Sequence, residues 1–276
     1  MTAMADTPQA TPTAIFQRVD ENIYRPTELA VGPWDPGALH GGPPCALLAG
    51  ALQRAVVDAD LGVEFFPARF TAELVRPVPL DDLTIATSMR RPGRRICIAD
   101  ATLAGPDGKT AVSATLHAIR RRPFDHGHQT DLVTPPGPEN AVGLTAATLD
   151  GPPSFHRSGV EHRAVNGTSF EAVGPATDWI RLRVPLVDGQ ETAPLERVVA
   201  AADFGNGVSK VFDMDEVLFV NPDLNVLLYR LPVGEWICLD AVTRFGDEGV
   251  ALAESLLFDE QGPIGRSAQT LLVEPR

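Results

Sequence analysis

The chain has 276 residues, of which 44% are hydrophobic, and a formal net charge of −13. This length allows one large domain or two smaller ones, each with its own core. The acidic balance argues against nucleic acid or an anionic membrane as the main partner, because both are bound by basic surfaces. The first fourteen residues lack the basic and apolar regions of a secretory signal, and no apolar run is long enough to span a membrane. We therefore expect a cytoplasmic protein with no membrane span.

The three cysteines, Cys45, Cys97 and Cys238, lie far apart and form no Cys-x-x-Cys pair. This spacing predicts neither a disulfide framework nor a zinc site, so we interpret all three as buried apolar residues. The sequence also contains no P-loop, no Rossmann glycine pattern and no Gly-x-Ser-x-Gly elbow. We therefore expect no cofactor and no metal ion.

The first half of the chain predicts short strands, one helix and then a group of strands. Residues 1–13 are small and polar, which predicts disorder, and strands are expected at 15–19 and 24–31. Prolines 43 and 44 then open an Ala- and Leu-rich run at 45–56, which predicts a helix. This helix is apolar on nearly every face, so we expect it to be buried. Four strand-like runs separated by turns follow, at 65–76, 83–90, 95–103 and 110–120.

The second half of the chain repeats this plan after a polar, proline-rich segment at 122–153, which predicts a linker. Strands are expected at 155–163 and 179–184, and a helix at 192–203. Four further strands are expected at 224–231, 236–244, 250–258 and 264–273. The order and the turns match the first half at low identity, which predicts a duplicated architecture. Pairing of the two units edge to edge would give one sheet with both helices on one side and would cover an exposed edge.

Several short motifs occur in the order that one known family shows. They are Pro33-Trp34-Asp35, His40-Gly41-Gly42, Leu74-Val75-Arg76-Pro77-Val78-Pro79, Arg91-Pro92-Gly93-Arg94-Arg95, Ala202-Asp203-Phe204, Trp236–Thr243 and Ser267-Ala268-Gln269. With these motifs, about residues 14–275 resemble the TesB-like (type II) acyl-CoA thioesterases. The resemblance implies an α+β tandem, or double, hotdog, in which each curled antiparallel sheet surrounds a central helix. The expected domains are an N-terminal hotdog at 14–121 and a C-terminal hotdog at 154–276, joined by the linker.

The resemblance also implies an activity and a site. In this family an Asp, a Thr or Ser and a Gln hold the hydrolytic water, and these roles fall on Asp203, Thr243 and Gln269. Thr243 has competitors in Val242 and Arg244, because the hairpin length differs here. The implied substrate is an acyl-CoA. The resemblance also implies a homodimer or a higher homo-oligomer, and no residue in the sequence determines the oligomeric state.

Asp203 is a candidate on physical grounds as well, because it closes an apolar helical run on an element that we expect to be buried. A buried carboxylate is costly without partners, and Thr243 and Gln269 would supply hydrogen bonds while one oxygen remains for water. The alternative interpretation is that Asp203 caps the turn at 204–207.

Gly41 and Gly42 precede the first predicted helix, where free backbone N–H groups and the positive end of the helix dipole favour an anion. They are candidates for an oxyanion hole, with a simple turn as the alternative. His40 and Trp34 are candidates for the substrate pocket. Since the glycines lie in one half and Asp203 in the other, we expect one composite site at the domain junction.

Residues near the start of the chain also match a second class of enzyme in part. Asp35 and His40 partly match the Asp-x4-His motif of hotdog enoyl-CoA hydratases, in which both residues activate water, although Gly37-Ala38 replaces the Asn-Pro of that motif. A third alternative is a non-catalytic protein that binds acyl-CoA or an acyl carrier.

Overall fold

The computed structural model describes residues 12–124, 133–144, 149–165, 170 and 172–276. Most of the segment predicted to be disordered, and parts of the predicted linker, lie outside these residues. The first half contains β1 (Phe16–Asp20), β2 (Ile23–Pro26), the 3-10 turn η1 (Glu28–Ala30), α1 (Gly42–Asp58), β3 (Phe65–Leu74), β4 (Leu83–Pro92), β5 (Ile96–Ala104) and β6 (Thr110–Arg120). The helix and the four strands after it match the prediction.

The second half repeats this order with additions. It contains η2 (Pro138–Asn140), β7 (Val142–Gly143), η3 (Phe155–Gly159), β8 (Val160–Val165), β9 (Ala176–Leu182), α3 (Pro194–Ala202), α4 (Gly205–Val208), β10 (Val217–Val220), β11 (Asp223–Leu228), β12 (Ile237–Phe245), β13 (Val250–Asp259) and β14 (Gly262–Pro275). The α+β class is confirmed, with one long helix and one shorter helix against an antiparallel sheet.

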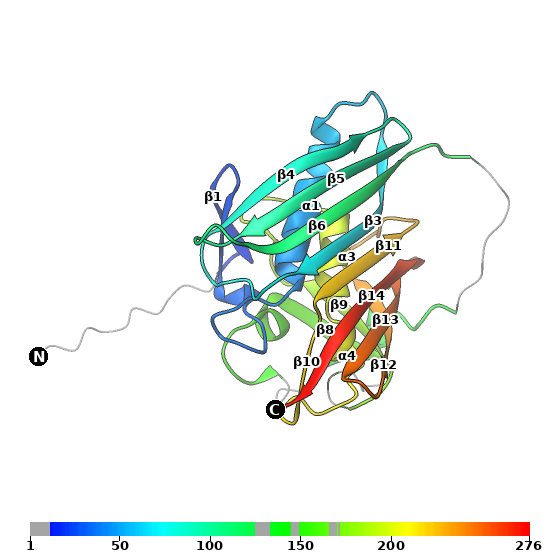
Figure 1. Ribbon diagram of the computed structural model, residues 1–276. Coiled ribbons are helices and arrows are strands. Elements are labelled where there is room, and N and C mark those ends of the chain that lie inside the picture. Colours follow the sequence, from blue (N-terminus) through cyan, green and yellow to red (C-terminus); the bar gives the residue numbers. More distant parts are fainter. Residues whose placement is uncertain (1–11, 125–132, 145–148, 166–169, 171) are drawn as a thin grey trace, which may run out of the picture.

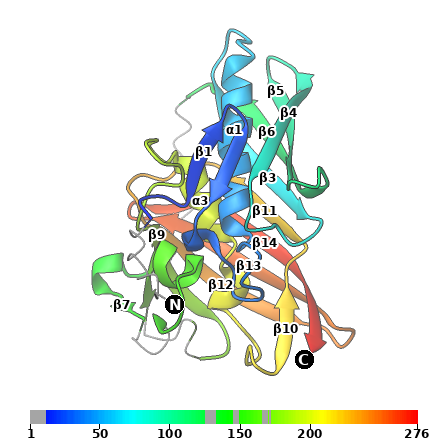
Figure 2. The same ribbon diagram turned by 90° about the vertical axis from the view of Figure 1, so that its left-hand side faces the viewer.

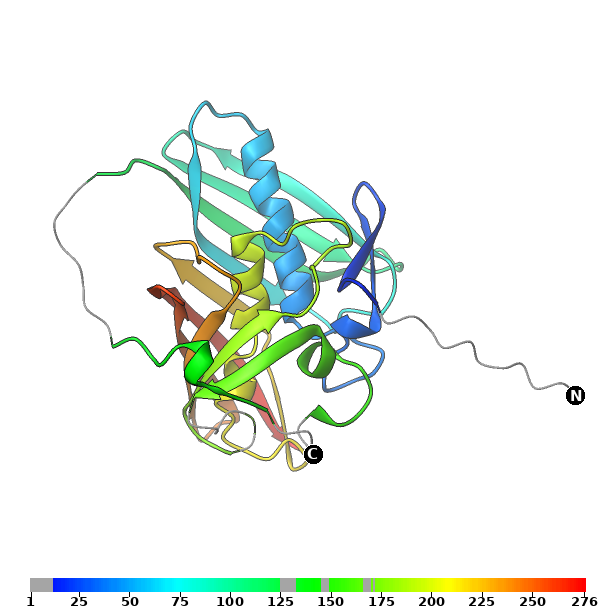
Figure 3. The same ribbon diagram turned by 180° about the vertical axis from the view of Figure 1, so that it is seen from behind.

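The two halves join through β3 and β11. Antiparallel pairing sets Phe70 opposite Val226 and Ala72 opposite Leu224. Through this pair the described strands form one continuous sheet in the order β1-β2-β4-β5-β6-β3-β11-β14-β13-β12-β9-β8-β7, with β10 beside β14 (Figure 1). Both helices lie on the same face of this sheet (Figure 3), so the predicted edge-to-edge arrangement is confirmed.

Helix α1 is buried from Gly42 to Leu52 because these residues leave no polar face. Residues 42–49 are all buried, and Leu47, Leu48 and Leu52 have no exposed surface. The two helices pack side by side (Figure 2). A side chain at Gly50 would collide with the carboxylate of Glu196, so glycine permits this close packing. The packing brings the N-terminus of α1 against the C-terminus of α3.

The strand predicted at 155–163 was wrong over its first five residues, which form one turn of π-helix, η3. The Ser154 side chain accepts from the backbone N–H of Arg157, and Gly159 packs against the carbonyl oxygen of Leu29. That contact comes from the other half of the chain, so local periodicity does not reveal it. Helix α4 and strand β10 were not predicted. No helix in the described ranges is long and apolar enough to cross a membrane.

Candidate active site

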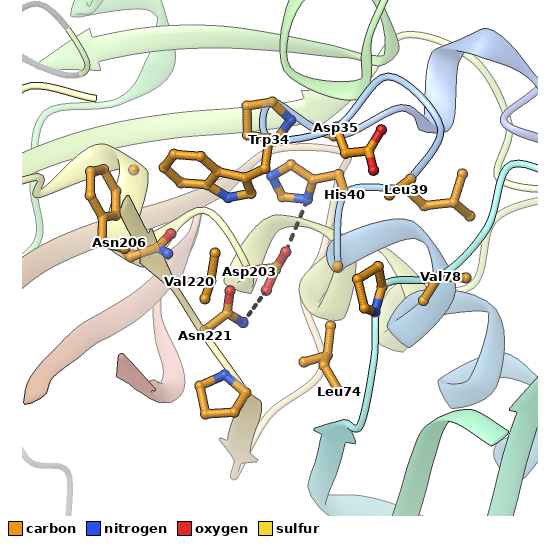
Figure 4. Close-up of a pocket in the computed structure, with 18 of the residues that line it drawn as sticks. Trp34, Asp35, Leu39, His40, Leu74, Val78, Asp203, Asn206, Val220 and Asn221 are labelled. Carbon is orange, nitrogen blue, oxygen red and sulfur yellow. Dashed lines mark hydrogen bonds and ion pairs between the residues drawn. The ribbon is translucent and has the colours of Figure 1, made fainter. Parts of the chain in front are cut away.

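A cavity of about 440 Å³ lies where the two halves meet. The first half contributes residues 32–35 and 38–41 and the end of β3 with its following loop. The second half contributes η3, the turn after α3 and the segment between β10 and β11. Most of the wall is apolar, and the polar side chains of the wall include His40, Asp203 and Asn221, which lie in a row in Figure 4. An apolar cavity with a few convergent polar groups is typical of a ligand site.

Asp203 is the central charged group of this cavity and is only 3% exposed. Its Oδ1 accepts two hydrogen bonds, from Asn221 Nδ2 at 2.8 Å and from Gln269 Nε2 at 3.0 Å. Its Oδ2 lies 2.9 Å from His40 Nδ1. These partners offset the cost of burying the carboxylate. The structure therefore brings Asp203 and Gln269 together, and none of these side-chain bonds goes to the turn at 204–207 that the alternative interpretation proposed.

Gln269 is held in a single orientation by its own contacts. Its Oε1 accepts from the backbone N–H of Asn206 at 3.2 Å, and its Nε2 also donates to the backbone oxygen of Asp203. The amide nitrogen must therefore face Asp203. Gln269 is 1% exposed, so this geometry is a fixed part of the core.

His40 faces two competing partners through one nitrogen. Nδ1 lies 2.9 Å from Asp203 Oδ2 and 3.1 Å from the backbone nitrogen of Gly42. A nitrogen that donates its proton to the carboxylate cannot accept from the Gly42 N–H. With Asp203 ionised, Nδ1–H pairs with Asp203, and the Gly42 N–H is left without that acceptor.

Gly41 is a glycine because Asp203 lies against it. A methyl group on Gly41 would stand 2.8 Å from Asp203 Oδ2 and 2.9 Å from Leu74 Cδ2. At Gly42 the same change would meet the carbonyl oxygen of Ala200 at 2.6 Å. The glycine pair thus allows the carboxylate of one half to approach the N-terminus of α1 in the other half, where the helix dipole favours negative charge.

Thr243 lies elsewhere, contrary to the expectation that it would hydrogen-bond Asp203. Its hydroxyl pairs with Ser209 Oγ at 2.8 Å. Across the sheet Thr243 is opposite Ala253, which is in turn opposite Gln269, so a whole strand separates Thr243 from Gln269. Asn221 occupies the position beside Asp203 that the sequence interpretation gave to Thr243.

Asn221 was not among the site residues predicted from the sequence. It lies between β10 and β11 and is followed by Pro222, whose carbonyl accepts from the backbone N–H of Leu74 at the domain junction. The signal in the sequence is a polar residue between two apolar strand runs, but no strand was predicted at Val217–Val220. The carbonyl oxygen of the Asn221 side chain has no hydrogen-bond partner among the described residues.

Asp35 and His40 do not form the pair that a hydratase would need. Asp35 is exposed and its Oδ1 accepts from the backbone N–H of Gly37 at 2.8 Å, while His40 contacts Asp203. Trp34 lines the cavity, with its ring 5.2 Å from that of Phe219 in an edge-on arrangement.

Cys45, which lies near this site, is not suited to act as a nucleophile. Cys45, in the first turn of α1, is buried, and burial together with the charge of Asp203 raises the pKa of its thiol well above the ordinary value. A cysteine that stays protonated as the neutral thiol is a poor nucleophile. In the described part of the chain no group of three or more His, Cys, Asp and Glu residues is arranged to hold a metal ion.

Solved structures share this architecture at low identity and define the class as a double hotdog. A putative thioesterase from Novosphingobium aromaticivorans is 22% identical, covers 95% of this chain and 99% of its own, and has a TM-score of 0.69. An acyl-CoA thioesterase II, TesB2, from Mycobacterium marinum is 15% identical, with 95% and 96% covered and a TM-score of 0.62. A hot dog fold protein from Alicyclobacillus acidocaldarius is 16% identical, with 94% and 95% covered and a TM-score of 0.65.

The family follows from the sequence profiles. The profile of the acyl-CoA thioesterase N-terminal domain matches residues 30–119, and that of the C-terminal domain matches residues 130–273. The chain belongs to the acyl-CoA thioesterase family, and the TesB-like resemblance of its motifs is confirmed. No protein with curated annotation matches the chain in sequence.

Proposed function

We propose that the protein hydrolyses acyl-CoA thioesters to the free acid and CoA, with Asp203 as the general base. The observation that carries this proposal is the Asp203 carboxylate, buried in an apolar cavity and oriented by donors from three separate elements. Oδ1 is saturated by Asn221 and Gln269. Within the described part of the chain, Oδ2 has one polar contact, with His40, so it keeps a lone pair for a water molecule.

The attacking water has two acceptors in this arrangement. One hydrogen points to Asp203 Oδ2 and the other to the free carbonyl oxygen of Asn221. These two bonds would aim an oxygen lone pair at the thioester carbonyl, and positioning of this kind supplies a large share of catalysis. Asn221 replaces Thr243 in the role that the resemblance implied.

The oxyanion is assigned to the N-terminus of α1. As the water oxygen attacks, its proton passes to Asp203 Oδ2 and negative charge develops on the former carbonyl oxygen. The backbone N–H groups of Gly41 and Gly42 are the donors proposed to stabilise it, aided by the dipole of α1. The carbon–sulfur bond then breaks, and the proton on Asp203 passes to the departing CoA thiolate.

The test is a panel of acyl-CoAs with straight and branched chains, followed by release of free thiol. Thiol release with formation of the free acid supports the proposal. Hydration of an enoyl-CoA without thiol release would point to the hydratase class. Ligand-dependent thermal stabilisation without turnover would point to a binding protein.

A further inference from the structure

A row of three hydrogen-bonded polar side chains leads from the core to the same cavity. Asp178 on β9 is fully buried, and its Oδ2 lies 2.6 Å from Nδ1 of His162 on β8. The other nitrogen of His162, Nε2, lies 3.2 Å from Nδ1 of His156 in η3. His156 is half-buried and lines the cavity that contains Asp203. The mechanism above uses none of these three residues.

The carboxylate at the buried end of this row sets which nitrogen donates and which accepts in each hydrogen bond. With both imidazoles neutral, a carboxylate can only accept, so the proton of His162 sits on Nδ1 and its Nε2 becomes an acceptor. His156 must then carry its proton on Nδ1. Its Nε2 is left unprotonated, as a hydrogen-bond acceptor without a partner among the described residues.

The surroundings keep His156 neutral. Its ring centre lies 4.5 Å from that of Phe170 and 6.2 Å from that of Phe204. Burial is the largest cause that lowers the pKa of His156 to about 3. The residue therefore offers a neutral acceptor to the cavity and does not attract an anion.

We propose that Nε2 of His156 accepts a hydrogen bond from an O–H or N–H group of the bound thioester, and that His162 is the positioning residue that fixes the tautomer. The inference rests on the proposed function, because it places the thioester in this cavity. The donor has two chemical sources, a hydroxyl group on the acyl chain or an amide N–H of the pantetheine arm of CoA.

Binding of non-hydrolysable thioether analogues tests this contact. The probes are the thioether analogues of hexanoyl-CoA and of 3-hydroxy- and 5-hydroxyhexanoyl-CoA, measured by titration calorimetry. In His156→Phe we expect Kd to rise about fivefold, the effect of one net hydrogen bond. A rise for a hydroxylated analogue alone assigns the donor to the acyl chain, and an equal rise for all three assigns it to pantetheine.

The matched control is His117→Phe. His117 lies on β6, away from the cavity, and contacts Arg69. If Kd for every analogue is the same in His156→Phe as in His117→Phe, the inference is overturned.

Nitrogen NMR of 15N-histidine tests the tautomer without any ligand. At pH 7.5 the expected spectrum has the His156 proton on Nδ1 and a bare Nε2. His162→Gln should preserve both this tautomer and Kd, since the amide oxygen accepts from His156 and the amide nitrogen donates to Asp178. His162→Leu should lose both. A proton on His156 Nε2 in the wild-type protein overturns the inference even if a His162 variant fails to fold.

The two proposals fail in different ways. If no thioester is hydrolysed but Kd still depends on His156, the hydrolase assignment falls and the acceptor role stands. If thioesters are hydrolysed and Kd does not depend on His156, the acceptor role falls and the hydrolase assignment stands.

Discussion

Asn221 Nδ2 donates to Asp203 Oδ1 at 2.8 Å, and this bond ties the segment between β10 and β11 to the end of α3. The same amide nitrogen donates to the backbone oxygen of Asp223 at 3.1 Å, so it is fixed toward the carboxylate. The side-chain oxygen of Asn221 is thereby turned away from Asp203 and remains available as an acceptor. This geometry assigns Asn221 two tasks, orienting the base and orienting the water.

Replacement of Asn221 should therefore affect turnover more than stability. Asn221→Ala removes one of the two donors to Asp203 Oδ1 and one acceptor for water. We expect kcat for acyl-CoA hydrolysis to fall about 10- to 100-fold, the scale for lost positioning in an active site. Steady-state kinetics with a thiol-release assay measures this change.

The comparison variant is Thr243→Val, because Thr243 is the residue that the sequence favoured for the same role. It loses the hydrogen bond with Ser209, which should lower the free energy of unfolding by about 1 kcal/mol, while kcat should change by less than about twofold. A larger loss of kcat in Thr243→Val than in Asn221→Ala would restore the sequence-based assignment.

Gly41→Ala should disable the site by crowding the base. The added methyl group would meet Asp203 Oδ2 at 2.8 Å, which pushes the carboxylate away from the N-terminus of α1. We expect kcat/KM to fall about 100-fold, since a displacement near 1 Å has that effect.

The matched control for this variant is Gly37→Ala, whose methyl group meets Asp35 Oδ1 at 3.4 Å, an ordinary contact. Activity of Gly37→Ala should stay close to that of the wild type. Equal activities of the two alanine variants would show that the approach of Asp203 to α1 is not needed.

The lowered pKa of His156 gives the protein an acid-sensitive stability. An unfolded imidazole takes up a proton near pH 6.5, whereas in the folded protein burial delays this to about pH 3. Between these values the unfolded state binds more protons, so stability falls as pH falls, and above pH 6.5 the contribution is complete.

His156→Phe should remove this dependence. Between pH 7 and pH 5 the loss of unfolding free energy should be about 2 kcal/mol smaller in the variant than in the wild type. Urea unfolding at both pH values measures the difference. The same loss in both proteins would mean that His156 does not titrate as its burial implies.

The sequence predicts most of the fold, because the relevant signals are local. The apolar run of α1, the turn between the strands predicted at 95–103 and 110–120, and the matching order of strands in both halves each indicate an element without reference to the rest of the molecule. The turn η3 escapes prediction because Gly159 is fixed by contact with Leu29 of the other half. Strand β10 escapes because a strand of four residues carries little periodic signal.

The site is predicted only in part, for a geometric reason. Asp203 stands out in sequence as a charge at the end of an apolar helix, and Gln269 through its motif. The choice between Thr243 and Asn221 depends on which segment of the sheet reaches Asp203. The strand order places β11 and β14 next to each other, and two strands, β14 and β13, separate β12 from β11. This order is a property of the assembled sheet, so the residues alone cannot supply it.

The most direct test of the account is thiol release from acyl-CoA by Asp203→Asn. The amide keeps the shape of the side chain but removes the base, so kcat should fall at least about 100-fold, while circular dichroism and acyl-CoA binding show a folded protein. Asp247→Asn, at an exposed residue of the β12–β13 turn, should keep wild-type activity. Thiol release by Asp203→Asn at the wild-type rate would contradict the account.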